Sequence, residues 1–416
     1  MVNQVPIGRM RWSNIAASNA LLAVMLILAA IALGDGARKA LINSQDFQWS
    51  GARLLLHRQD PYKTFVKHLQ GDPTASRSFI LTQAPNYQVT ALGLLIPYAA
   101  LPWTLAKITW AISNAVFIGL ILYALRTLLM QEVSWRVFIL VSLAFIACTP
   151  TRVAIGNGQH SLISIAFFVL ALMAESRERP VLATIALSIA WFKYTVTFPL
   201  TIIFVVKRRW DILIGATVIQ CIGFALLSIW LDVNPITLLL EPFKVNQLST
   251  QSGYTDFFAL ATRLGITHRE IPLAATAAIT ALVIVRAMQI GTGNSLRVLS
   301  VLSILSILWT FHLYYDTVVL IFPLCYLVMH WERGNSPAIA RTPIEAAGRL
   351  VLLAAILCSW VLDWIVWGLG KAGVPGAQAV IPTYNWIVTA LYMTALIFLL
   401  FSPEERWNES TLAACE

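Results

Sequence analysis

Residues 21–33 read Leu-Leu-Ala-Val-Met-Leu-Ile-Leu-Ala-Ala-Ile-Ala-Leu, a run without a single polar side chain. They belong to a longer apolar stretch, 15–34, which matches the ~20 residues that a helix needs to cross a bilayer. The whole chain agrees, because 58% of its 416 residues are hydrophobic and 12% are charged, against roughly 25% charged in a typical soluble domain. The sequence therefore predicts an all-α, polytopic integral membrane protein.

Twelve apolar stretches of the sequence are candidate transmembrane helices. They are 15–34, 101–129, 137–148, 158–174, 181–192, 196–206, 212–231, 271–290, 296–311, 313–330, 350–369 and 386–401. A further stretch, 86–100, is expected to form a re-entrant or interfacial helix. We therefore expect a single integral membrane domain over residues 1–416 with about twelve spans.

The basic residues predict the orientation of these spans. Arg9 and Arg11 precede the first span, so we expect a retained first helix with its N-terminus in the cytoplasm. Alternation of the spans then places the short basic loops on the same side: Arg126 and Arg136, Arg177 and Arg179, Lys207 to Arg209, Arg297, Arg333 and Arg341. This pattern predicts cytoplasmic N- and C-termini in the inner, or plasma, membrane of the cell. The long loops 35–85 and 232–270 are then extracytoplasmic, and we expect the active site there.

The sequence also excludes several functions. Its net charge of +9 is explained by cytoplasmic loops, and no basic block with interleaved aromatic residues indicates nucleic-acid binding. The five cysteines are scattered without a CxxC pair, which argues against a disulfide framework or a zinc site. Nucleotide-binding and hydrolase motifs such as Walker A, HExxH and GxSxG are missing. We expect neither a cofactor nor a metal.

The first outer loop, 35–85, contains an expected amphipathic helix that lies on the membrane surface. Its apolar and small residues fall on one helical face: Phe47, Ser50, Gly51, Leu54 and Leu55. Asp46 stands near the start of this helix, where a carboxylate can cap unpaired N–H groups. Asp60-Pro61-Tyr62 is expected to close the helix, because proline cannot continue it.

The chain resembles glycosyltransferase family 87, the polyprenyl-phosphate-mannose-dependent α-mannosyltransferases of the GT-C superfold. The stretches that carry the resemblance follow in the expected order: Asp46 to Ala52, Leu54-Leu55, Asp60-Pro61-Tyr62, Gly156-Asn157-Gly158-Gln159, Phe192-Lys193 with Pro199, Lys207 to Trp210, Gln251-Ser252, and His312-x-x-Tyr315-Asp316. The sequence departs from the family at Gln59, where glycine is usual, and at Pro199, a displaced proline. The sugar and its acceptor are left open by these departures.

The resemblance implies an inverting reaction in which a carboxylate takes the proton of the acceptor hydroxyl and cations hold the departing phosphate. It assigns the base to Asp46, with Asp60 and Asp35 as alternatives, and gives His312 a catalytic role. The competing interpretation of Asp46 is a helix cap. For His312 it is a buried histidine that is hydrogen-bonded to Asp316.

Two cations are expected to bind the donor phosphate. Lys193 interrupts an apolar run, with snorkelling to the membrane surface as the alternative. Arg152 precedes a helix start, where unpaired N–H groups attract anions, with a solvated loop arginine as the alternative. The residues expected to contact the substrates are Asp60, Tyr62, Gln159, Gln251 and Asp316. Turn formation by Asp60 and helix capping by Gln159 or its neighbour His160 remain open.

We therefore expect a hexosyltransferase similar to mannosyltransferases. It would move a sugar, mannose by the resemblance, from a polyprenyl-phosphate donor to a glycolipid or glycan acceptor within the lipid bilayer, as in glycolipid biosynthesis. A multispanning transporter or flippase of a lipid-linked sugar is the main alternative, and it would concentrate charge near the bilayer midplane. A non-catalytic subunit with the same fold is the second alternative.

Overall fold

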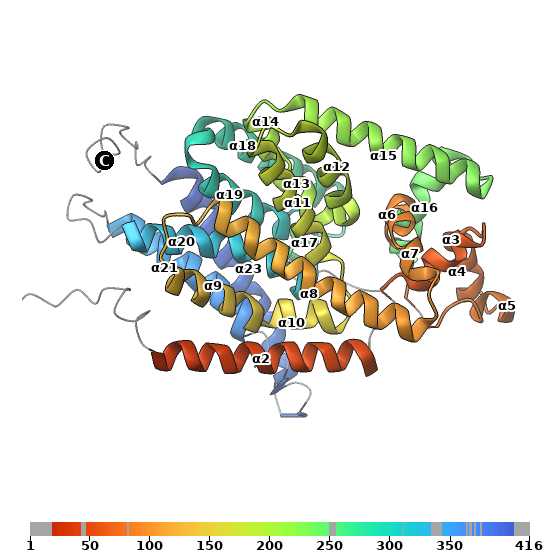
Figure 1. The fold of residues 1–416 in the computed structure, drawn as a ribbon, viewed down its shortest axis with the longest axis horizontal. Helices are drawn as coiled ribbons and strands as arrows, with labels where there is room; N and C mark the ends of the chain where they lie inside the picture. Colours follow the sequence, from red (N-terminus) through yellow and green to blue (C-terminus); the bar gives the residue numbers. More distant parts are fainter. Residues whose placement is uncertain are drawn as a thin grey trace, which may run out of the picture.

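The computed structural model describes residues 19–42, 47–80, 83–248, 255–310, 312–333, 343–362, 365, 368–369, 372–374 and 377–402. These residues form helices and connecting turns without a β-strand, and the long helices run mostly along the long axis of the molecule (Figure 1). Helices are expected here, because a chain in lipid must satisfy its own backbone N–H and C=O groups. The predicted all-helical class is confirmed.

Eight helices of the described chain are long and apolar enough to cross a membrane. They are α2 (Asn19–Ile42), α8 (Trp103–Leu128), Pro180–Leu200, α15 (Trp210–Leu231), α18 (Glu270–Ile290), Tyr314–Glu332, Pro343–Val361 and Thr383–Phe401. A bent pair, α9 (Trp135–Ala147) and α10 (Thr149–Gly156), meets at 51° and makes a ninth if it counts as one span. The chain is therefore polytopic, and the number twelve stays a prediction.

The other helices connect these spans or subdivide them. They are α3 (Trp49–Leu56), α4 (Pro61–Leu69), α5 (Pro73–Ser76), α6 (Val89–Leu94), α7 (Ile96–Ala99), α11 (Ser161–Ser176), α12 (Pro180–Ala190), η1 (Trp191–Lys193), α13 (Tyr194–Leu200), α14 (Ile202–Val206), α16 (Pro235–Leu248), α17 (Phe257–Arg263), η2 (Thr292–Asn294), α19 (Ser295–Leu308), η3 (Tyr314–Leu320), α20 (Ile321–Arg333), α21 (Pro343–Leu357), η4 (Cys358–Leu362) and α23 (Ala377–Phe401). The stretches 181–192 and 196–206, predicted as two spans, form the chain of short helices from α12 to α14.

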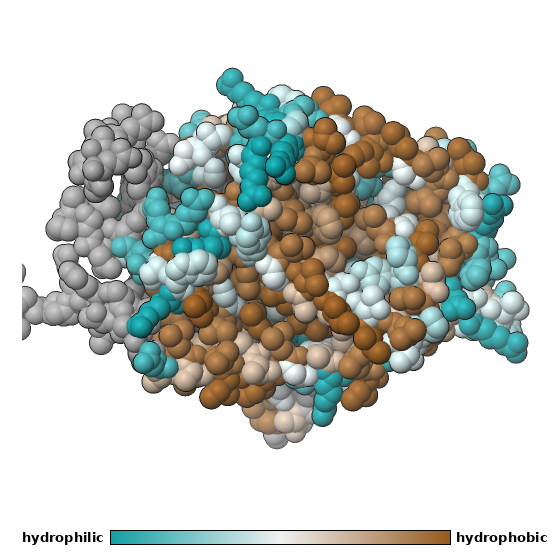
Figure 2. Space-filling model, in the orientation of Figure 1, coloured by the Kyte–Doolittle hydropathy of each residue, from teal (hydrophilic) through white to brown (hydrophobic). Residues whose placement is uncertain are grey.

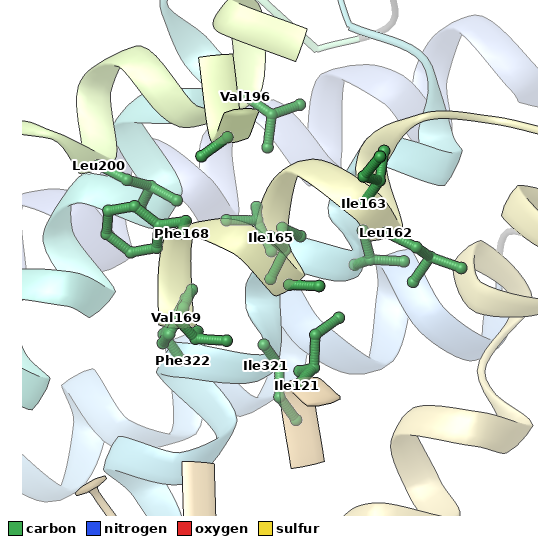
Figure 3. Packing of buried hydrophobic residues seen from close by; sticks show 14 of the residues in the cluster. Ile121, Leu162, Ile163, Ile165, Phe168, Val169, Val196, Leu200, Ile321 and Phe322 are labelled. Atoms are coloured by element: carbon green, nitrogen blue, oxygen red, sulfur yellow. The ribbon is translucent and has the colours of Figure 1, made fainter. Parts of the chain in front are cut away.

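The core is centred on α11, which is short and apolar all round. Figure 3 shows Ile165, Phe168 and Val169 of this helix packed among α8, α13 and α20. Phe168 meets Phe322 edge to face, with ring centroids 6.1 Å apart, and Leu200 of α13 is fully buried beside them. A helix that is hydrophobic on every face is buried among other helices, so α11 carries the residues at its N-terminus deep into the bundle.

The outer surface of the bundle is strongly hydrophobic. Figure 2 shows a broad apolar face, to which α2 and α15 contribute exposed side chains such as Ile31 (63% exposed) and Ile229 (77% exposed). An apolar surface of this extent is not stable in water, and it marks the region that lipid covers.

The first loop differs from its prediction in detail. Helix α2 continues through Ile42, so the first span reaches into the stretch expected to be loop. Helix α3 begins at Trp49, with Gln48 in the N-cap position, and Asp46 lies outside the described residues. It ends at Leu56, and Asp60 starts the next helix, α4, instead of closing α3.

Helices α21 and α23 pack so closely that Gly348 has no room for a side chain. A Cβ atom added at this buried glycine falls on the ring of Phe398. We expect Gly348→Ala to destabilise the protein by ~1–3 kcal/mol through overpacking, as measured by unfolding in detergent. Gly119→Ala is the control, because a Cβ there meets nothing within 4 Å and alanine favours the helix. Equal loss of stability in both variants would contradict this packing.

Candidate active site

The site is built around a break in the helix that contains Lys193. The 3₁₀ turn η1 separates α12 from α13, and Pro199 within α13 lacks the N–H that would bond the Thr195 carbonyl. Trp309 donates its indole N–H to that carbonyl instead, at 2.6 Å. The Thr197 hydroxyl donates to the Ala190 carbonyl across the break, at 2.8 Å. These side chains replace lost backbone bonds and hold the turn that carries Lys193.

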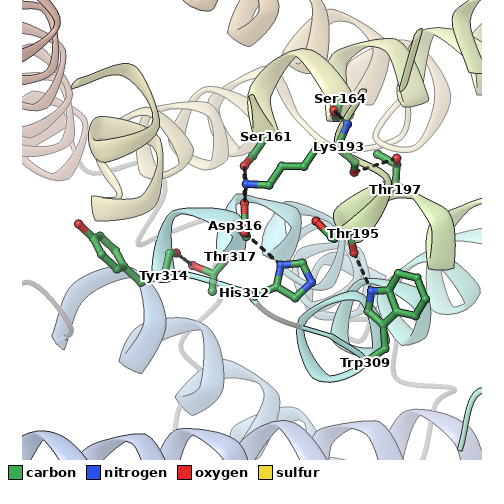
Figure 4. A network of polar contacts seen from close by, with 10 residues as sticks. All are labelled: Ser161, Ser164, Lys193, Thr195, Thr197, Trp309, His312, Tyr314, Asp316 and Thr317. Carbon is green, nitrogen blue, oxygen red and sulfur yellow. Dashed lines mark hydrogen bonds and ion pairs between the residues drawn. The ribbon is translucent and has the colours of Figure 1, made fainter. Parts of the chain in front are cut away.

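Lys193 forms a buried ion pair with Asp316. Its Nζ lies 2.6 Å from Asp316 Oδ1, and the two residues are 7% and 3% exposed. Ser161, at the start of α11, hydrogen-bonds both groups, and Nζ stands 4.7 Å from the ring centroid of Tyr315. Figure 4 shows how η1, α11 and η3 meet at this pair. Burying either charge without the other would cost several kcal/mol, so the pair ties the three elements together.

Asp316 also orients His312. Nδ1 of His312 lies 3.0 Å from Asp316 Oδ2, and a carboxylate that is paired with a lysine can only accept there. Nδ1 therefore carries the proton, and in a neutral imidazole Nε2 is then an acceptor. Nε2 is buried and finds no partner among the described residues. The network thus presents one basic nitrogen that is fixed in direction and open to a ligand.

Aromatic residues cover the other side of Lys193. His160, the neighbour of Ser161, stacks on Phe192 with ring centroids 4.7 Å apart and an interplanar angle of 23°. Tyr87 packs against it edge to face, also at 4.7 Å. Nε2 of His160 lies 3.0 Å from the Phe47 carbonyl, to which it donates. Its imidazole therefore joins the first loop to the site.

A sequence model described as glycosyltransferase family 87 matches residues 86–359, more than half of the chain. The chain belongs to glycosyltransferase family 87. No curated protein and no solved structure matches it. The family match includes Lys193, His312 and Asp316, so the buried network lies in the part of the chain that defines membership. The first-loop stretch from Asp46 to Tyr62 lies before the matched residues.

The structure brings together three of the residues that the sequence singled out: Lys193, His312 and Asp316. It also contains Ser161, which sequence analysis missed. Ser161 and Ser164 are three residues apart at the start of an apolar helix, and the Ser164 hydroxyl accepts the backbone N–H of Lys193 at 3.0 Å. Two serines at this spacing lie on one face of an apolar helix, and this pattern could have predicted a polar site there.

Arg152, which the sequence predicts to bind phosphate, forms an ion pair with an acidic residue. Its Nη1 lies 2.5 Å from Asp35 Oδ2, and Lys39 pairs with the same oxygen at 2.9 Å. These three charged side chains lie where α10 packs on α2. Asp35, the third candidate for the base in this family-87 protein, is thus engaged with two cations.

Asp60 and Tyr62 have structural contacts. Asp60 caps α4, its Oδ1 accepting from the backbone N–H groups of Tyr62 at 2.9 Å and Lys63 at 3.1 Å. The Tyr62 hydroxyl donates to the Tyr87 carbonyl at 2.6 Å, next to the aromatic cover of the site. Gln159 is buried beside His160. Asp46 and Gln251 lie outside the described residues.

The charges in the site are few and balanced. In the described part of the chain, no three His, Cys, Asp or Glu side chains cluster as metal ligands would. Lys193 and Asp316 neutralise each other, and His312 directs Nδ1 to Asp316 and leaves Nε2 without a partner among the described residues. Such an arrangement can position a hydroxyl group or share its proton, and it supplies no strong acid.

The ion pair generates a prediction about stability. Lys193→Met leaves the Asp316 carboxylate buried without its counter-charge, so we expect a loss of ~3–5 kcal/mol, measured by denaturant unfolding in detergent. Asp316→Asn should cost a similar amount. The double variant removes both charges and should lose less than the sum of the two single variants.

Lys63→Met provides the control for this cycle. Lys63 lies 3.8 Å from Asp60, with its side chain 55% exposed, and a surface pair of this kind contributes less than ~1 kcal/mol. Strictly additive losses at Lys193 and Asp316 would show that the two groups do not interact.

Proposed function

We propose that this family-87 glycosyltransferase is an inverting enzyme that transfers mannose from a polyprenyl-phosphate donor to a glycolipid or glycan acceptor. The reaction would take place on the extracytoplasmic face of the cell membrane, with both termini in the cytoplasm. The observation that carries the proposal is the buried network of Lys193, Asp316 and His312, which lies inside the family match. Ionisable groups at such depth in a membrane protein are usually functional.

The proposed chemistry needs one base and no strong acid. As the acceptor oxygen bonds to the anomeric carbon, the bond from that carbon to the phosphate oxygen breaks, and polyprenyl phosphate leaves as an anion. The acceptor proton passes to a carboxylate. We propose Asp46 for this role, supported by the family resemblance and by the position of its neighbour Phe47, whose carbonyl contacts His160. Asp60 and Asp35 are engaged as a helix cap and as an ion-pair partner.

Phosphate binding is proposed for Arg152 and Lys193. The Lys193 ammonium has three N–H groups, of which Asp316 and Ser161 take two. Arg152 presents a planar guanidinium that matches phosphate oxygens, and it sits on α10, which packs on α2. His312 would act beside them through Nε2, toward a substrate hydroxyl. Substrate contacts by Gln159 and Gln251 complete the proposal.

The experiment is sugar transfer from radiolabelled polyprenyl-phosphate-mannose to membrane glycolipid by purified protein. We expect transfer by the wild type, a ~10²–10⁴-fold lower rate for Asp46→Asn and a clear loss for His312→Ala. Asp232→Asn is the matched control, because Asp232 is an exposed residue at the C-terminal end of α15 with φ 52°, a conformation that asparagine tolerates.

The outcomes separate the alternatives. Normal turnover by folded Asp46→Asn would move the base to another carboxylate. Movement of the lipid-linked sugar across a vesicle membrane without transfer would favour a flippase over an enzyme. Absence of both activities with every polyprenyl-phosphate sugar would favour a non-catalytic subunit.

A further inference from the structure

A cavity of about 20 Å³ adjoins His312. Its polar lining comes from distant parts of the chain: Thr255, His312, Tyr314, Thr317, Ser359 and Tyr392. The walls are buried except at Leu313 and Tyr314, which are half-buried, so the cavity lies close to the surface there. A space of this size admits one water-sized polar group.

His312 decides which kind of group fits. Its Nδ1 proton is used by Asp316, so Nε2 offers a lone pair. A buried acceptor without a donor costs ~1–3 kcal/mol. The group that completes this wall must therefore donate a hydrogen bond.

The hydroxyl groups of Ser359 and Tyr392 also line the cavity. Ser359 donates its proton to the Ala355 carbonyl at 2.8 Å, and its oxygen is hydrogen-bonded to the Tyr392 hydroxyl. Because the serine proton is already used, Tyr392 is the donor in that bond. Ser359 belongs to the π-helical turn η4, a wide turn that is frequent at functional sites. Tyr392 lies beyond the residues of the family match.

We infer that this cavity is a subsite for one hydroxyl group of a sugar, with His312 Nε2 accepting a hydrogen bond from it and Ser359 and Tyr392 completing the polar lining. A phosphate oxygen is disfavoured, because an anion has no proton to offer to His312 Nε2. The inference rests on the proposed function and deepens it, since the hydroxyl belongs to the donor or to the acceptor. Ser359 and Tyr392 are then specificity-determining residues.

The test measures ligand binding by thermal stabilisation of the purified full-length protein. Polyprenyl-phosphate-mannose is compared with polyprenyl phosphate, and octyl α-mannoside with octanol, for the wild type, Tyr392→Phe and Ser359→Ala. We expect both variants to bind one of the two sugar-bearing probes roughly 3–10-fold more weakly, the value of a lost or distorted hydrogen bond. Their binding of the sugar-free probes should be unchanged.

Ser303→Ala is the matched control, because the Ser303 hydroxyl donates to Leu299 within its own helix, as Ser359 does to Ala355. It should bind every probe like the wild type. A loss confined to polyprenyl-phosphate-mannose assigns the hydroxyl to the donor, and a loss confined to octyl mannoside assigns it to the acceptor.

Two results would overturn the inference. One is unchanged binding of both sugar-bearing probes by both variants, which would leave the cavity to a structural water. The other is that the wild-type protein binds each sugar-bearing probe no more tightly than the matching sugar-free probe. Weaker sugar binding by the variants together with no sugar transfer by the wild type would instead support the subsite and count against the proposed enzyme.

Discussion

The structure depends on the ion pair between Lys193 and Asp316 in an apolar bundle. Each charge alone would cost several kcal/mol at this depth, so the fold must bring the two residues together. They come from two interrupted segments, η1 and η3, and Ser161 at the start of α11 hydrogen-bonds both. The pair therefore joins the two breaks at the start of α11.

The same pair connects stability with chemistry. Because Asp316 is held as a carboxylate, it fixes the proton of His312 on Nδ1 and leaves Nε2 as an acceptor in a buried place. His160 and Phe192 are covalent neighbours of Ser161 and Lys193, so the aromatic contacts that reach the first loop are set by the same geometry. A defect in the pair should disturb both sides of the site.

Much of the fold could be predicted from the sequence, because apolar length decides the spans. The ends of α8, α15 and α18 lie within two residues of their predictions. Lys193 and His312 stood out as ionisable residues in apolar runs. The sequence could not show that Lys193 meets Asp316, 123 residues later, or that Arg152 meets Asp35, because such pairs depend on how distant helices pack. Helix breaks repaired by side chains, as at Pro199, were hidden for the same reason.

The most direct measurement of this account is the protonation of His312, read from ¹⁵N NMR of histidine-labelled protein and assigned with His312→Gln. The account predicts a proton on Nδ1 and none on Nε2, together with a change in the His312 signals when Lys193 is replaced by methionine. A ring protonated on Nε2, or on both nitrogens, would contradict the account, because Nε2 would then have no lone pair for a substrate hydroxyl.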